Sequence, residues 1–208
     1  MFKYILPCLL LLAACQPQQE RDITPPPVPP QTVQAKEMTG SDIRDKNLGS
    51  KLPLAATLGG EVLFAEKTNH ISLISFGYTH CPDICPTTLL TLSQAIKKLS
   101  PKQAASVRVY FVTLDPERDS LEVLHGYVTL FHPDFIGLRP TMEQLEQVKQ
   151  DWRVVGEFVP LSNGSYTVDH STGIYMIDKQ GKTAVYEPYG TTAQELADDI
   201  ALFLEQNP

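Results

Sequence analysis

The chain has 208 residues, and 42% of them are hydrophobic, which suffices for one packed domain of about 150 residues plus a tail and excludes disorder throughout. Its formal net charge of −7 argues against nucleic-acid binding, because a phosphate backbone requires a basic protein surface. Of the four cysteines, Cys8 and Cys15 lie in the N-terminal segment, and only Cys81 and Cys85 fall in the region that predicts a folded domain.

The first residues have the organisation of an export signal. Lys3 supplies a positive charge, and the apolar stretch 5–12 is well below the roughly 20 residues that a membrane-spanning helix needs. Residues 12–15 (LAAC) resemble a bacterial lipobox, in which the cysteine becomes the first mature residue and carries lipid. We therefore predict that residues 1–14 are a signal peptide. Cys15 is then lipid-anchored to a membrane of the bacterial cell envelope, with the domain outside the cytoplasm; an ordinary cleaved signal is the alternative.

Residues 15–44 are predicted to tether the lipidated cysteine to the domain. Residues 25–30 (PPPVPP) are almost all proline, and the whole stretch has few core-forming residues, a composition typical of an extended linker. At about 3.1 Å per residue it reaches several tens of Å, towards a membrane-bound partner or simply as a spacer. The folded domain is expected to occupy residues 45–208.

The pattern of apolar residues in this domain predicts a mixed sheet with helices on both faces. A hairpin is expected around Gly59-Gly60, and Asp119 is expected to cap the helix that follows it. Strands and helices alternate in the first half of the domain, and a helix, a hairpin and a last helix follow. The strands are expected at 71–76, 107–114, 154–159, 173–177 and 183–186, and the helices at 86–99, 119–131, 141–152 and 194–203.

The segment 76–86 (FGYTHCPDICP) carries the residues best suited to chemistry. Cys81 and Cys85 can converge across one turn where a strand ends and a helix begins, and Pro86 suits the first helical turn. The positive end of the helix favours thiolate over thiol. A thiolate is both the nucleophile of disulfide exchange and a soft ligand for copper(I), so the spacing leaves a disulfide, a redox pair and a metal site open.

A histidine far along the chain is a candidate third ligand. His170 lies in residues 166–173 (YTVDHSTG), just before a predicted strand. Two thiolates and one imidazole suit copper, whereas a structural zinc site is normally closed by a fourth ligand. From spacing alone, a structural loop histidine is the more common interpretation.

Three segments together resemble the Sco/SenC family of copper-binding assembly factors. They are residues 76–86, residues 113–119 (TLDPERD) and residues 168–171 (VDHS), and they occur in the family's order. The resemblance covers residues 45–205 and implies a thioredoxin-like α/β fold with an N-terminal hairpin and an insertion before the site histidine. One departure is that residues 67–70 (KTNH) replace the family's usual Gly-Lys turn.

The resemblance also implies a function. Cys81, Cys85 and His170 would bind one copper ion per chain, as Cu(I) or Cu(II), and the client would be the binuclear copper centre of cytochrome c oxidase. The protein is then a copper metallochaperone for assembly of that centre. The alternatives are a thiol–disulfide oxidoreductase, in which Cys81 and Cys85 keep the client's copper-ligating cysteines reduced, and a copper or redox sensor. Expected partners are the copper-centre subunit of the oxidase, the membrane, and other copper chaperones or thioredoxin-like reductants.

Charged residues beside these motifs are expected to have structural roles. His80 adjoins Cys81, but adjacent side chains point apart, so it is not expected to be a ligand. Asp83 and Asp169 are expected to be solvated or to support the ligands by hydrogen bonds. The charged residues of 115–119 are expected to order the loop at the carboxyl edge of the sheet, where sites in such sheets usually lie.

Overall fold

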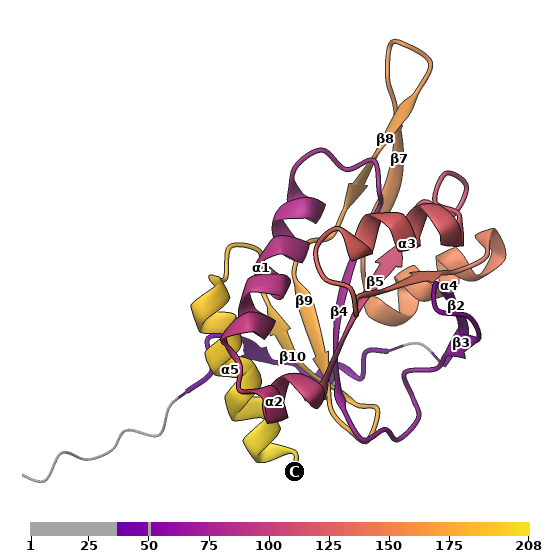
Figure 1. Ribbon diagram of the computed structural model, residues 1–208. Coiled ribbons are helices and arrows are strands. Elements are labelled where there is room, and N and C mark those ends of the chain that lie inside the picture. The colour runs from indigo at the N-terminus through magenta and orange to yellow at the C-terminus, as the bar shows by residue number, and fades with distance from the viewer. Residues whose placement is uncertain (1–36, 50) are drawn as a thin grey trace, which may run out of the picture. The chain divides into compact units, whose positions relative to one another are not determined.

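The structure is a computed structural model that describes residues 37–49 and 51–208, shown in Figure 1. The predicted signal peptide, Cys15 and most of the predicted tether lie outside the described residues. In the part that is described, none of the helices combines the length and the apolar character that crossing a membrane requires.

An 8-stranded mixed sheet forms the centre of the domain, in the order β1-β10-β9-β4-β5-β6-β2-β3. The middle strands β4, β5 and β6 are parallel, and the other neighbours pair antiparallel. All seven residues of β4 are buried, as expected for a strand covered on both faces. The strands are β1 (Ser41–Asp42), β2 (Leu54–Ala56), β3 (Glu61–Val62), β4 (Ile71–Gly77), β5 (Val107–Thr113), β6 (Ile136–Arg139), β9 (Ile174–Ile177) and β10 (Thr183–Glu187).

Helices cover both faces of this sheet. On one face, Leu89 and Leu92 of α1 share a core with Ile200 of α5 and Leu124 of α3. Figure 1 shows α1 and α5 side by side. On the other face, α4 contributes Trp152 to an aromatic core. The helices are α1 (Ile84–Lys98), α2 (Pro101–Ala105), α3 (Leu121–Thr129), α4 (Met142–Trp152), α5 (Ala193–Gln206) and the short 3₁₀ helix η1 (Arg44–Lys46).

This arrangement confirms the predicted thioredoxin-like α/β fold and its N-terminal hairpin, with two differences in detail, the start of the first strand and the cap of α3. The hairpin around Gly59 and Gly60 forms between β2 and β3, and both glycines have positive φ. The first strand, β1, begins at Ser41, before the start at residue 45 that the sequence predicts, and it pairs with β10. The prediction that Asp119 caps α3 is wrong. Ser120 is the cap, because its side chain accepts a hydrogen bond from the backbone N–H of Val123.

A separate hairpin is inserted between α4 and β9. Its strands β7 (Gly156–Pro160) and β8 (Tyr166–His170) form a two-stranded antiparallel sheet in which Gly156 lies opposite His170. In Figure 1 this hairpin projects beyond the main sheet, past the first turn of α1. His170 is therefore the last residue of a strand, and not part of a loop before one as the sequence suggests. The strands β6 and β8 are not predicted by the apolar pattern.

Candidate metal centre

The two cysteines are placed by the junction between the central strand and the first helix. Cys81 lies in the turn after β4, where its backbone N–H donates to the carbonyl of Tyr78 at 3.2 Å. Cys85 lies in the first turn of α1 and is 2% exposed. Its sulfur fits against the end of β4 only because residue 77 is glycine: a Cβ there would lie 2.3 Å from Cys85 Sγ. Neither of these two cysteines is in a disulfide.

The β7–β8 hairpin places His170 near these two sulfurs. His170 Nδ1 lies 2.8 Å from the carbonyl oxygen of Ser171, so the Nδ1–H donates there and Nε2 is the nitrogen that faces the sulfurs. Nε2 lies 3.4 Å from Cys85 Sγ. The ligand atoms of Cys81, Cys85 and His170 all lie within 4.8 Å of one another, close enough to hold one metal ion. Within residues 37–49 and 51–208 this is the one group of three or more such residues.

The environment makes the two cysteines unequal. A hydrogen bond from Cys85 is the largest cause that lowers the pKa of the half-buried Cys81 to about 3; a hydrogen bond from His170 and backbone N–H groups add to it, and burial opposes them. The same hydrogen bond, burial and the charge of Cys81 raise the pKa of Cys85. Burial lowers the pKa of His170, but its contacts with Cys81 and Ser171 outweigh burial and raise it. The resting pair is therefore a thiolate at Cys81 and a thiol at Cys85.

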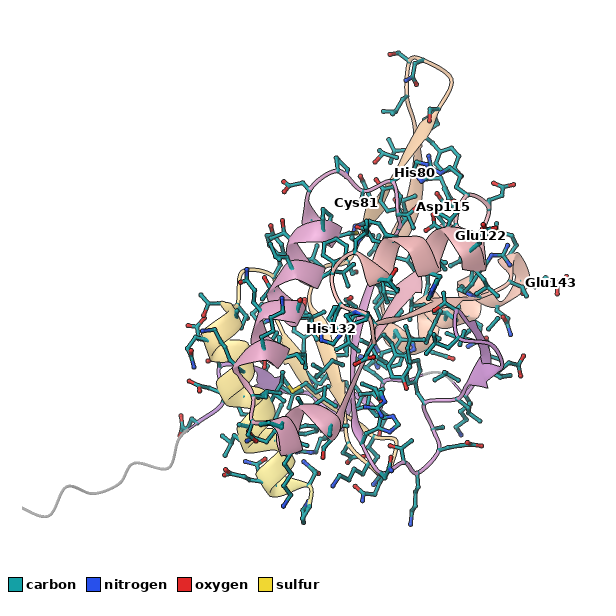
Figure 2. The ribbon with its side chains drawn as sticks, in the orientation of Figure 1. His80, Cys81, Asp115, Glu122, His132 and Glu143 are labelled. Atoms are coloured by element: carbon teal, nitrogen blue, oxygen red, sulfur yellow. The ribbon has the colours of Figure 1, made fainter. Side chains whose placement is uncertain are left out.

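The group opens to solvent through a shallow hollow of about 320 Å³. Figure 2 shows Cys81 and His80 where α1 begins and the β7–β8 hairpin leaves the domain. His80 is exposed, lies 3.1 Å from the Thr79 hydroxyl, and is not part of the metal-binding group. The predicted supporting residues Asp83 and Asp169 are exposed at the rim.

The sequence predicts Asp119 as a helix cap within a charged segment that orders the loop, but it does not predict the contacts of Asp119 with the turn that carries Cys81. This carboxylate is fully buried and accepts hydrogen bonds from the Thr79 backbone N–H at 3.0 Å and from the Thr79 hydroxyl at 2.5 Å. The Thr113 hydroxyl donates to it at 2.6 Å. Asp119 thus ties the turn that carries Cys81 to the end of β5. Its place in the charged segment 115–119 that follows a buried strand is the signal in the sequence that points to this role.

The chain matches known sequences over most of its folded part. The SCO1/SenC family model matches residues 41–205. An SCO2-like protein of Rickettsia prowazekii is 37% identical over 142 residues, which is 67% of this chain and 69% of that protein. The mitochondrial SCO2 homolog of Bos taurus is 37% identical over 130 residues, 62% of this chain, and the match spans only about half of that protein, 49%.

A solved structure has the same fold. The crystal structure of Arabidopsis thaliana ScoI with copper bound superposes with a TM-score of 0.71 at 30% sequence identity. The superposition covers 76% of this chain and 99% of the plant chain.

Proposed function

The chain belongs to the SCO1/SenC family, and from this premise we propose that it carries one copper ion for the assembly of cytochrome c oxidase. Cys81, Cys85 and His170 would hold the ion, as Cu(I) or Cu(II), and the binuclear copper centre of the oxidase would receive it. Copper is cargo in this proposal, so the site must bind it firmly and also release it.

One observation supports this proposal most strongly: two sulfurs and an imidazole nitrogen lie within 4.8 Å of one another at a solvent-open hollow. Thiolate and imidazole together suit copper. A structural zinc site would be closed by a fourth protein ligand, and the described residues offer no fourth member of the group. The Nδ1–H of His170 is held by the Ser171 carbonyl, which leaves Nε2 as the nitrogen that binds the ion.

The inequality of the cysteines favours a second function, reduction of the client's copper-ligating cysteines. The Cys81 thiolate would attack a client disulfide, form a mixed disulfide and release one client thiolate. Cys85, once deprotonated, would attack Cys81 Sγ and release the second client thiolate, which leaves a Cys81–Cys85 disulfide. Two electrons pass to the client, and a thioredoxin-like reductant would restore the pair.

Replacement of the histidine separates these two functions. His170→Ala should lose tight copper binding and keep disulfide reduction, because thiol exchange does not need the imidazole. Copper retention is measured by competition with a chelator, and reduction with a disulfide peptide of the client. His132→Ala is the matched control, since His132 is also partly buried but lies outside the group. Unchanged copper affinity in His170→Ala, or stoichiometric copper in Cys81→Ser or Cys85→Ser, would refute the proposed site.

We also propose that lipid on Cys15 holds the domain at the outer side of a bacterial envelope membrane. The short apolar segment, the small residues before Cys15 and the proline-rich stretch after it support this. Anchoring raises the effective concentration of the domain near a membrane-embedded oxidase. Cys15→Ser should leave copper binding unchanged but impair lipoprotein processing and oxidase assembly at low copper. Wild-type protein that fractionates with membranes yet takes up no labelled lipid would contradict the anchor.

A further inference from the structure

The strand that carries His170 is not paired with the main sheet. In the part of the chain that the structure describes, β7 and β8 pair only with each other. A hairpin without a shared ladder receives no register from the sheet beside it. The position of His170 relative to the two sulfurs is therefore set by its short chain connection to β9 and by side-chain contacts between β8 and the domain.

The main contact of this kind is a closed network around Arg118. The Arg118 Nε–H donates to Asp115 Oδ2, and an Nη1–H donates to the backbone carbonyl of Tyr166 in β8 at 2.9 Å. The guanidinium carbon lies 3.7 Å from the centroid of the Tyr166 ring. The Tyr166 hydroxyl donates back to Asp115 Oδ1 at 2.9 Å. The three residues close a ring of contacts between the β5–α3 connection and the hairpin.

The chemistry of this network makes it rigid. Asp115 is 0% exposed, and a buried carboxylate is strongly destabilising unless it is paired and hydrogen-bonded. The planar guanidinium can pair with the carboxylate, donate to the carbonyl and stack on the ring at the same time, which a lysine ammonium cannot do. Loss of one member therefore frees the start of β8, four residues before His170.

A second contact carries the constraint to the histidine. The hydroxyls of Tyr78 and Thr167 are hydrogen-bonded at 2.7 Å. This bond joins the turn of residues 78–81, which carries Cys81 and is called the cysteine turn, to β8. The Tyr78 ring packs edge-on against the His170 ring with centroids 5.8 Å apart, and Arg118 lies 5.6 Å from the Tyr78 centroid. Arg118 thus lies near two aromatic rings, that of Tyr166 in β8 and that of Tyr78, which packs against His170.

We propose that Arg118, paired with Asp115, is a positioning residue that clamps Tyr166 and so presents His170 to the two sulfurs. Arg118 is not a member of the metal-binding group; it acts through β8. The metal-binding part of this inference rests on the proposed function, since it concerns the affinity of the same group for copper. The mechanical part, that Arg118 holds the hairpin, stands without any metal.

Two substitutions test the clamp from its two sides. Arg118→Lys keeps a positive charge beside the buried Asp115, so the domain should fold, but it cannot both stack on Tyr166 and bond to the carbonyl. Tyr166→Leu removes the ring and hydroxyl and leaves the Asp115–Arg118 pair. Arg139→Lys is the matched control, because Arg139 donates to the carbonyls of Pro116 and Asp119 in the same connection.

Both clamp variants should weaken Cu(II) binding by about 10- to 100-fold, the loss typical when a supporting contact of a metal ligand is removed. In metal-free protein they should also speed amide hydrogen exchange in β8, and Arg139→Lys should do neither. In the His170→Ala background, Arg118→Lys should cause no further loss of copper affinity, because the residue acts through the histidine.

Three results would overturn the clamp. They are unchanged β8 exchange in both clamp variants, looser β8 with unchanged Cu(II) affinity, and an equal loss of affinity with and without His170. If wild-type protein binds no copper, the proposed function fails by itself. Faster β8 exchange in metal-free Arg118→Lys would in that case still support the mechanical role of Arg118.

Discussion

The two halves of the metal-binding group are built in different ways. The cysteine half follows from the main chain: β4 pairs with β5 on one side and β9 on the other, and its end leads directly into the turn of Cys81 and the helix of Cys85. The histidine half belongs to a hairpin that pairs only with itself among the described residues. Side chains, with Arg118 at their centre, hold it against the domain.

This difference gives the two proposed functions different sensitivities. Thiol exchange needs only the cysteine half, which the central sheet fixes. Copper binding needs the two cysteines and the histidine in the correct position relative to one another. A change in the sheet should therefore abolish both activities, whereas a change at the hairpin should reduce copper binding and leave thiol chemistry in place. Each variant below changes one of the two halves, or neither of them, so that the effects on copper binding and on thiol exchange can be compared.

Gly77→Ala should have the largest effect, because it disturbs the packing of Cys85 against the end of β4. The new Cβ would lie 2.3 Å from Cys85 Sγ and 3.0 Å from the Phe111 ring. Such overpacking should destabilise the domain by about 1–3 kcal/mol in denaturant unfolding and displace the sulfur, so that both copper binding and disulfide exchange are lost. Gly126→Ala is the control. A Cβ at Gly126, in helix α3, meets nothing within 4 Å, and alanine there should be neutral or stabilising.

The pH dependence of Cys81 alkylation tests whether Cys81 is a thiolate. With a pKa lowered to about 3, Cys81 is already a thiolate at pH 5, so its alkylation rate in metal-free protein should be nearly flat from pH 5 to 8. An ordinary thiol, with a pKa of about 8.5, would react about tenfold faster per pH unit over this range. Mass spectrometry after iodoacetamide pulses measures the rate and should find Cys85 protected. A tenfold rise per pH unit at Cys81 would contradict the assignment.

The cysteine half is also the half that the sequence predicts well. An apolar run gives β4, helical spacing gives α1, and the position of Cys81 and Cys85 at their junction follows from chain order alone. Local patterns suffice there, because neighbours in the sequence remain neighbours in the structure.

The histidine half could not be derived from local patterns. His170 contacts residues about 85 positions away, and family resemblance, not spacing, identified it. Strand β8 carries polar and apolar residues in a pattern too short to distinguish from a loop. Asp119 carries a helix-cap signature, but burial and three hydrogen bonds give it another role. The positions and roles of such residues depend on tertiary contacts, which a short stretch of sequence does not contain.

Asp119→Ala should have an intermediate effect confined to the cysteine turn. It leaves the Thr79 backbone N–H and the buried Thr113 hydroxyl without their acceptor, which should cost about 1–3 kcal/mol in urea unfolding. The freed turn should also weaken copper binding and alter the alkylation rate of Cys81, because both depend on where that sulfur lies. Glu117→Ala, an exposed neighbour in the same connection, should change none of these quantities. Equal behaviour of the two variants would mean that Asp119 does not hold the turn.

Glu187→Gln should have the smallest effect and should spare both halves. Glu187 and Asp199 are buried side by side at the β1 edge of the sheet, where the Gly40 N–H donates to Asp199 at 2.9 Å. Burial, and then the charge of Asp199 and a hydrogen bond with it, raise the pKa of Glu187 to about 8.

Because the folded state holds this proton more tightly than the unfolded chain, the stability that Glu187 contributes is fully present below about pH 4.3, the ordinary glutamate pKa. It is lost as the pH rises through about 8. Glutamine cannot ionise, so the variant should match the wild type at pH 4 and melt at least about 2–4 °C higher at pH 9, since each kcal/mol shifts the melting temperature by that much in a domain of this size. Thermal unfolding at the two pH values measures this, with the exposed Glu205→Gln as control.

Copper affinity at pH 7 should be unchanged, because this pair touches neither the cysteine turn nor the hairpin; a loss of affinity would mean that the β1 edge is coupled to the site.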